Sequence, residues 1–130
     1  MLYFLRIQYK EFTVYCLCTM SWASSNIYIC GTVKNCETYL ENVFSNIKQI
    51  TDLFADYHII IYFDISKDAT LLKLTQYKKL LGNKLTIIVN KDPVSPRRTE
   101  NIAKGRNNCL QKIRDTIGGF SPCDYFIVMD

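Results

Sequence analysis

The sequence predicts a three-layer α/β/α fold built on a mainly parallel sheet, and two observations lead to this prediction. First, short apolar runs alternate along the chain with longer segments whose apolar residues recur at helical spacing. Second, the runs are apolar throughout rather than at every other position, which is typical of strands covered on both faces in a parallel sheet. Strand and helix alternate from the first run to the last, which is the order of a doubly wound α/β domain.

Four apolar runs are predicted as core strands: 26–31 (NIYICG), 59–63 (IIIYF), 85–89 (LTIIV) and 125–129 (YFIVM). The first run closes on a glycine, which indicates a tight turn. The second and fourth runs each lead straight into an aspartate, Asp64 and Asp130. Since ligands of open parallel sheets bind at the carboxyl ends of the strands, these two carboxylates are candidates for a ligand site.

Two helices are predicted between the first three strands. The first starts at about Thr38, with Asn35 placed to cap it, and the second is capped by Asp68 and stopped by Gly82. Their spacing predicts that both helices pack on the sheet. The apolar residues are Leu40, Val43, Phe44, Ile47, Ile50 and Phe54 in the first helix and Leu71, Leu72, Leu74, Leu80 and Leu81 in the second.

The third predicted helix, from about Thr99 to Asp115, carries a charged residue in its apolar stripe. A guanidinium that faces a core needs a carboxylate or a phosphate beside it. Arg106 therefore indicates either an ion pair with Asp64 or Asp130, or an anionic ligand. The stripe consists of Ile102, Cys109, Leu110, Ile113 and Ile117, with Arg106 among them.

The first 25 residues are predicted to be an N-terminal extension of unknown role, and residues 26–130 form the domain. The extension is rich in aromatic and β-branched residues, but Arg6, Lys10 and Glu11 interrupt it before it reaches the ~20 apolar residues of a membrane span. We expect two short strands or a packed extension here, and no transmembrane segment.

Composition narrows the classes of function. A chain of 130 residues fits one domain, and its net charge of +4 is too weak to indicate nucleic-acid binding. The basic residues of 91–114 are interpreted as a solvated helix face and its lead-in loop. Six scattered cysteines show no zinc-type spacing, and there is no secretory leader or Asn-x-Ser/Thr sequon. We expect reduced thiols and a cytoplasmic protein.

Several common site motifs are absent. The chain has no G-x-G-x-x-G, no P-loop and no serine nucleophile elbow. The single histidine, His58, opens a buried strand, where a structural role is expected. A nucleotidyltransferase of related fold would need a glycine- and arginine-rich loop after Ile29, and that loop is missing.

Polar residues instead follow the strands. Asn35, Asp68 and Thr99 are interpreted as helix caps. Asp64 and Asp130 close fully apolar strands, where a carboxylate has no structural task, and Asp130 suits a hard divalent cation. The other polar residues at the strand ends are Thr32 after the first strand and Ser66 after the second.

Four segments in the same order resemble glycosyltransferase family 2. ICGTVKNCETYL (29–40) is similar to the family's opening strand and helix, and DISKDAT (64–70) to its Asp-Gly-Ser-x-Asp-x-Thr motif, with Ile65 in place of the usual glycine. AKGRN (103–107) resembles the Ala-x-x-Arg-Asn element, and YFIVMD (125–130) resembles the strand that ends in the first Asp of Asp-x-Asp. The RTEN lead-in and the Lys-Asn turn also resemble glycosyltransferases of large DNA viruses and fungal capsule-related mannosyltransferases.

The resemblance implies a GT-A fold (nucleotide-diphospho-sugar transferase-like), a nucleoside-diphosphate sugar as donor and a divalent cation, Mn²⁺ or Mg²⁺. It implies that Thr32, Asp64 and Arg106 bind the nucleotide, with Asp64 on the base, and that Asp130 holds the metal. A viral member would lie in the host cytoplasm or the virion.

The family's second metal-binding Asp, its acceptor half and its catalytic base have no counterpart in this sequence. We therefore expect the donor-binding half of a hexosyltransferase, incomplete at its C-terminus and inactive unless a C-terminal half or another subunit completes it. The last strand would then leave an open sheet edge, which predicts marginal stability or self-association. The alternative is a non-enzymatic interaction module on a degenerate scaffold of this kind, with the N-terminal extension as its binding surface.

Overall fold

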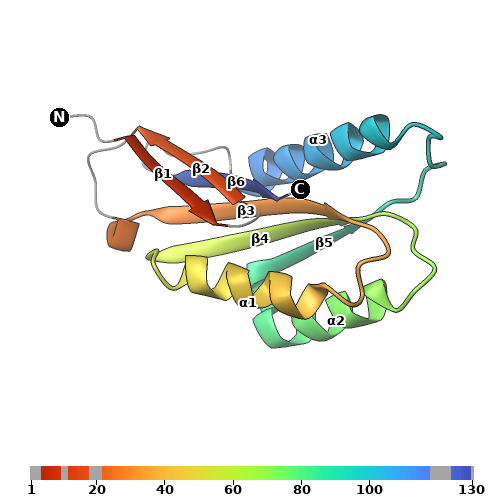
Figure 1. The fold of residues 1–130 in the computed structure, drawn as a ribbon, viewed down its shortest axis with the longest axis horizontal. Coiled ribbons are helices and arrows are strands. Elements are labelled where there is room, and N and C mark those ends of the chain that lie inside the picture. Colours follow the sequence, from red (N-terminus) through yellow and green to blue (C-terminus); the bar gives the residue numbers. More distant parts are fainter. Residues whose placement is uncertain (1–3, 10–11, 18–21, 118–123, 130) are drawn as a thin grey trace.

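The computed structural model describes residues 4–9, 12–17, 22–117 and 124–129, which form an α/β fold (Figure 1). The central sheet has four strands, all parallel, in the order β5-β4-β3-β6. Counted along the chain from β3, this order is 3-2-1-4, which matches the first four places of the doubly wound order 3-2-1-4-5-6. The predicted α/β fold with a parallel sheet is confirmed. The strands are β3 (Asn26–Val33), β4 (Asp56–Phe63), β5 (Leu85–Val89) and β6 (Tyr125–Met129).

Helices lie on both faces of the sheet. Helices α1 (Leu40–Thr51) and α2 (Thr70–Leu81) cover one face, and α3 (Arg98–Ile117) lies across the other (Figure 1). Two short 3₁₀ helices, η1 (Trp22–Ser24) and η2 (Gly82–Lys84), precede β3 and β5. The arrangement is consistent with three layers, α/β/α.

Each face of the sheet has its own core because successive strand residues point to opposite sides. Residues at odd positions, such as Ile29, Ile61 and Ile127, pack against α1 and α2. Residues at even positions, such as Cys30 and Tyr62, pack against α3. Both faces are therefore buried, as the continuous apolar runs predict.

The first two helices differ from their predictions in detail. Helix α1 starts at Leu40 and has no side-chain cap; Asn35 does not cap it, because the residue lies in a loop with a positive φ of 47°. In α2 only Leu74 among the predicted leucines is fully buried, whereas Leu72 and Leu80 are mainly exposed, at 62% and 79%. The predicted helix is present, and it turns only one narrow stripe of its leucines toward the sheet.

The N-terminal region forms a hairpin. Strands β1 (Phe4–Tyr9) and β2 (Phe12–Leu17) pair antiparallel as a separate two-stranded sheet, and β2 contacts β6 (Figure 1). The prediction of two short strands is confirmed. Within the described ranges, no helix has the length and apolarity that crossing a lipid bilayer requires.

Candidate functional site

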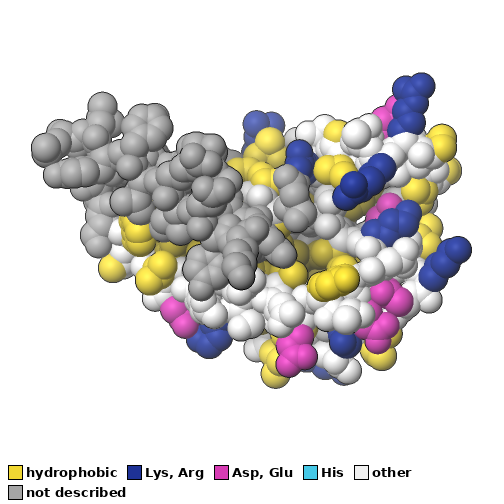
Figure 2. Space-filling model, viewed as in Figure 1, with side chains coloured by type: hydrophobic (Ala, Val, Ile, Leu, Met, Phe, Trp, Pro, Cys, Tyr) yellow, Lys and Arg dark blue, Asp and Glu magenta, His cyan; other side chains and the backbone are white. Residues whose placement is uncertain are grey.

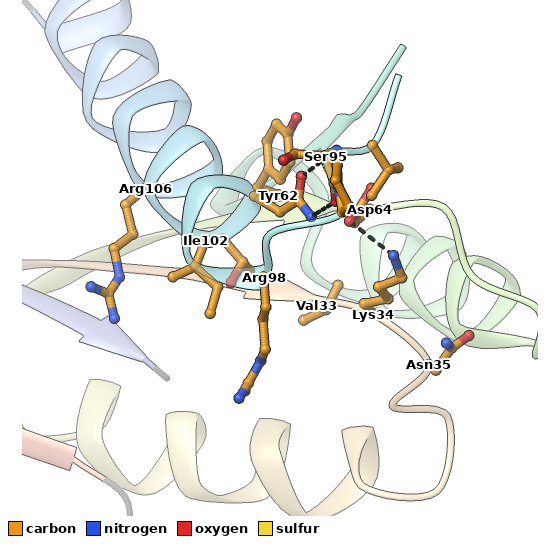
Figure 3. Close-up of a pocket in the computed structure, with 13 residues that line it drawn as sticks. Val33, Lys34, Asn35, Tyr62, Asp64, Ser95, Arg98, Ile102 and Arg106 are labelled. Atoms are coloured by element: carbon orange, nitrogen blue, oxygen red, sulfur yellow. Dashed lines mark hydrogen bonds and ion pairs between the residues drawn. The ribbon is translucent and has the colours of Figure 1, made fainter. Parts of the chain in front are cut away.

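A pocket of about 710 Å³ opens at the carboxyl ends of β3 and β4, beside the first turns of α3 (Figure 3). This volume falls in the range typical of small-molecule sites. The residues of the pocket come from β3 and its loop, from the end of β4, and from the segment that leads into α3. They are Thr32, Val33, Lys34, Asn35, Tyr62, Asp64, Val94, Ser95, Pro96, Arg98, Asn101, Ile102 and Arg106.

The pocket lies next to the point where the strand order reverses. From β3 the chain passes through α1 to β4 and on to β5, and it then returns through α3 to β6 on the other side of β3. Helix α1 leaves the end of β3 toward one face of the sheet, and α3, which follows β5, begins beside the pocket and crosses the other face. The pocket therefore lies in the crevice outside the carboxyl ends of the strands. Doubly wound proteins bind their ligands in this crevice. Of the predicted site residues, Thr32, Asp64 and Arg106 all line it.

Asp64 is the only acidic residue among the described residues that line the pocket, and its carboxylate is anchored on one side. Its Oδ1 accepts hydrogen bonds from the backbone N–H of Ile65 (2.9 Å) and from Nδ2 of Asn90 (3.0 Å). Its Oδ2 lies 3.3 Å from Nζ of Lys34. Burial is the largest single influence and opposes ionisation, but the hydrogen bonds from Asn90, Ile65 and Lys34 together outweigh it and lower the pKa of Asp64. The group is therefore a carboxylate at neutral pH.

Asn90, which directly follows β5, holds the Asp64 carboxylate in place through the hydrogen bond from its Nδ2 to Oδ1. It is buried, its backbone N–H donates to the carbonyl of Phe63 (2.9 Å), and its Oδ1 accepts from the N–H of Asp92 (3.0 Å). The role of Asn90 is not among the predictions from the sequence. The only available signal was its position, since Asn90 follows a strand that neighbours the strand ending at Asp64.

The loops after β3 and β4 are joined by hydrogen bonds. The N–H of Asn35 donates to Oγ of Ser66 (2.9 Å), and Oδ1 of Asn35 accepts from the N–H of Lys67 (2.7 Å). Asp68 accepts from the N–H groups of Glu37 and Thr70, both at 3.1 Å. Asn35, Ser66 and Asp68 thus serve the loops themselves. The N-cap position of α2 is Ala69 rather than the predicted Asp68, although Asp68 does accept a hydrogen bond from the N–H of Thr70, the first residue of the helix.

Helix α3 approaches the sheet closely at the pocket because Gly105 has no side chain. A Cβ on Gly105 would lie 2.2 Å from Cγ2 of Thr32 and 2.9 Å from Cδ1 of Tyr62. Real Cβ atoms do not come so near their neighbours. Gly105 therefore brings α3 against β3 and β4 and sets the width of the pocket at Thr32.

The other wall of the pocket is the first part of α3 and the segment before it. Asn101 holds this segment: its Oδ1 accepts from the N–H of Ser95 (2.9 Å), and its Nδ2 donates to the carbonyl of Ser95 (2.8 Å). From this wall the side chains of Arg98 and Arg106 extend in the same direction (Figure 3). Arg106 is half-buried and Arg98 is exposed. The interpretation of Arg98 as part of a solvated face misses its place at the pocket.

The charge of the lining is mainly positive. Within the described part of the lining, three cations, Lys34, Arg98 and Arg106, accompany one carboxylate, Asp64. Figure 2 shows Lys and Arg side chains gathered at the end of the molecule where the strands terminate and α3 begins. Such a lining favours an anionic ligand over a cation.

The predicted metal ligand, Asp130, lies outside the described residues. In the described part of the chain no group of three or more His, Cys, Asp or Glu side chains could hold a metal ion. Asp64 does not fit that task alone, because its Oδ1 already accepts two hydrogen bonds and its Oδ2 faces an ammonium group.

Three other residues with reactive side chains do not line the pocket. His58, near the start of β4, contacts Oγ1 of Thr86 (2.9 Å), and burial lowers the pKa of His58, consistent with the predicted structural role. Cys30 and Cys109 are free thiols with no exposed surface. The hydrogen bond with Cys109 and burial both raise the pKa of Cys30, so this thiol is not a nucleophile.

A second cavity, of about 460 Å³, lies between α1 and α2. Phe44, Ile47, Ile59 and Tyr77 contribute to its lining, and the Phe44 and Tyr77 rings stack at 3.9 Å. None of the predicted site residues lines it. The pocket at the strand ends is therefore the candidate site.

Comparison with known proteins adds no assignment: no protein-family model, no curated protein and no solved structure matches this chain.

Proposed function

We propose that the pocket binds a nucleoside diphosphate, and that this chain is the donor-binding part of a glycosyltransferase-like protein of the GT-A type. One observation carries the proposal: Thr32, Asp64 and Arg106, which are 74 positions apart from first to last in the sequence, line one cationic pocket at the switch point of the sheet. The resemblance to glycosyltransferase family 2 implies these same residues as nucleotide ligands.

The chemistry of the pocket supports such a ligand. Oδ2 of Asp64 is an acceptor suited to an N–H group of a base, and the half-buried Ile102 and the exposed Val94 offer apolar surface to a base or ribose. Arg98 and Arg106 can meet the charge of a diphosphate, and guanidinium groups bind phosphate in a bidentate manner. Charge neutralisation of this kind is also what a diphosphate leaving group needs during sugar transfer.

The transfer itself needs a general base for the acceptor hydroxyl, and none of the described pocket residues suits that task. We therefore propose that the described residues bind the donor, and that a C-terminal half or another subunit supplies the acceptor site. The divalent cation that the resemblance implies, with Asp130 as its ligand, remains part of the proposal, and no step above depends on it.

The test is calorimetric titration of the full chain with UDP and with GDP, each with and without Mn²⁺. We expect one of the two nucleotides to bind, and Arg106→Met to abolish that binding. Lys112→Met is the matched control, because Lys112 is an exposed cation of α3 that does not line the pocket, and it should bind like the parent.

Asp64→Asn tests the base contact and should weaken nucleotide binding by about 1–3 kcal/mol, because a charged hydrogen bond is lost. If neither nucleotide binds to the folded chain under any of these conditions, the proposal fails and the interaction module becomes the leading hypothesis. Equal loss of binding in the Lys112 variant would show that only the general charge of the helix matters.

A further inference from the structure

The two oxygens of the Asp64 carboxylate are in different situations. Oδ1 accepts from Ile65 and Asn90 and is therefore fully engaged in holding the fold. Oδ2 is the oxygen on the Lys34 side, and its partner among the described residues is Nζ of Lys34, at 3.3 Å. Any ligand that donates a hydrogen bond to Asp64 must therefore use the oxygen that Lys34 now occupies.

Lys34 is held loosely at its tip and firmly at its backbone. The contact of 3.3 Å is long for a charge-assisted hydrogen bond, and the Lys34 side chain is 45% exposed against 9% for Asp64. The backbone on either side is fixed, since the carbonyl of Val33 accepts from the N–H of Asp64 (3.0 Å) and Asn35 is bonded to Ser66. The ammonium group can therefore change partners by side-chain rotation alone.

An anion bound in the same pocket would offer the Lys34 ammonium group a second partner. Lys34 lines the cavity together with Arg98 and Arg106, and its Nζ points to Asp64, which lines the same cavity (Figure 3). A lysine suits such an exchange better than an arginine, because its charge is compact and its stem is flexible.

We propose that Lys34 is an exchangeable counter-ion: it neutralises Asp64 in the empty pocket and transfers to the anionic group of the ligand when the ligand binds. This inference rests on the proposed nucleotide site. The exchange uncovers Oδ2 of Asp64 for a donor on the ligand's base at the moment when Lys34 engages the phosphates. The pocket thereby selects ligands that carry both an anionic group and a hydrogen-bond donor, and it binds a nucleoside without phosphate weakly.

Inorganic pyrophosphate is the probe, because it carries the anionic group and no base. Calorimetry of the full chain is done on the parent, Lys34→Met, Asp64→Asn and the double variant. Asp64→Asn keeps an oxygen to accept from Ile65 and Asn90, so the fold is retained, and its amide group no longer attracts Lys34. Lys67→Met is the control, because Lys67 lies in the adjoining loop and does not line the pocket.

We expect Lys34→Met to weaken pyrophosphate binding by about tenfold, and Asp64→Asn to strengthen it by about tenfold because Lys34 has then lost its competing partner. In the Lys34→Met background the Asp64→Asn change should have almost no further effect. Lys34→Arg keeps the charge and should bind more tightly than Lys34→Met but less tightly than the parent, and Lys67→Met should bind like the parent.

Two results would overturn the exchange: an equal gain from Asp64→Asn with and without Lys34, which is a simple field effect, or no pyrophosphate binding to the parent. Nucleotide titrations separate the two proposals. The parent, Lys34→Met, Asp64→Asn and the double variant form a double-mutant cycle. If UDP or GDP binds but this cycle shows no coupling between Lys34 and Asp64, the exchange fails and the nucleotide site stands. If the cycle shows the coupling but neither nucleotide binds more tightly than pyrophosphate, the exchange stands and the nucleotide function fails.

Discussion

The two faces of the sheet are packed in different ways. The face under α1 and α2 is filled by large side chains, including Ile29, Ile61 and Leu74. The face under α3 holds tyrosines and cysteines, including Tyr62 and Cys109, and the helix comes near the strands at a glycine. The first face buries the larger apolar cluster, and the second places α3 at a short distance from the strands.

Because of this difference, we expect the face under α1 and α2 to contribute to stability, and the face under α3 to contribute to ligand binding as well. Helix α3 carries Arg98 and Arg106 to the pocket and lies close to Thr32. None of the fully buried residues of α1 and α2 lines the pocket. We therefore expect changes under α1 and α2 to alter the free energy of unfolding alone. Changes under α3 should alter binding as well, even where their effect on stability is smaller.

The largest effect is expected from Leu74→Ala, in the centre of the first face. Leu74 has no exposed surface, and removing its branched end leaves a cavity, so we expect a loss of about 3–4 kcal/mol in the free energy of unfolding. Denaturant unfolding measures this. Pyrophosphate binding, measured on the folded fraction, should be unchanged.

Leu72→Ala on the same helix is the matched control. Leu72 is 62% exposed, and its change should alter stability by no more than about 0.5 kcal/mol. If Leu74→Ala weakened pyrophosphate binding beyond its effect on the folded fraction, the separation of the two faces would be wrong.

The next effect is expected from Gly105→Ala. In a helix this change usually stabilises, by about 0.5–1 kcal/mol, but here the new methyl group would meet Thr32 at 2.2 Å and force α3 away from the sheet. Overpacking should dominate and leave a net loss of roughly 1–2 kcal/mol. Unlike Leu74→Ala, this variant should also bind pyrophosphate more weakly, because Arg98 and Arg106 move with the helix.

The companion variant Thr32→Ser removes the methyl group that Gly105→Ala would strike. Combined with Gly105→Ala it should restore part of the lost stability. Absence of any restoration would mean that the contact between α3 and β3 does not set the helix position.

Part of the fold and part of the site can be predicted from the sequence. The apolar runs predict the strands because burial on both faces excludes polar residues, and the convergence of Thr32, Asp64 and Arg106 follows from the shared edge of parallel strands and the stripe of α3. The roles of Gly105 and Asn90 depend on distances between secondary-structure elements, and the spacing of residues along the chain does not predict these distances. A lone glycine in a helix and a polar residue after a strand each have several common explanations.

The failed cap at Asn35 and the exposure of two α2 leucines have a similar cause. Asn35 stands where a cap is expected, but its hydrogen bonds go to the loop after β4, 31 and 32 positions away. Leu72 and Leu80 fit a helical pattern, and the pattern alone does not say how wide a stripe the sheet will cover. Local periodicity predicts which element forms, and tertiary contacts decide which of its residues are used.

The next effect, on stability and on the pKa of Asp64, is expected from Asn90→Ala, because Asn90 donates a hydrogen bond to the Asp64 carboxylate. The variant removes the hydrogen bond to Oδ1 of Asp64 and should cost about 1–2 kcal/mol of stability. It should also raise the pKa of Asp64, which carboxyl NMR on the folded protein measures directly.

The pH dependence of stability follows from the same carboxylate. The pKa of Asp64 is lowered in the folded protein, so its contribution to stability is present above the unfolded pKa and is lost as the pH falls through the folded pKa. Because Asn90→Ala raises the folded pKa, its acid-induced loss should be smaller than that of the parent. An unchanged pH profile would show that Asn90 does not hold the ionised form.

The smallest effect is expected from Lys104→Met, which removes a surface ion pair on the α3 side. Nζ of Lys104 lies 2.6 Å from Oδ2 of Asp92, and this pair joins α3 to the loop after β5. Both side chains are more than one third exposed, so water and salt screen the interaction. We expect no measurable change in the unfolding midpoint at physiological salt and a small decrease at low salt. A loss as large as that of Asn90→Ala would mean that charge, rather than close packing at Gly105, holds α3 on its face of the sheet.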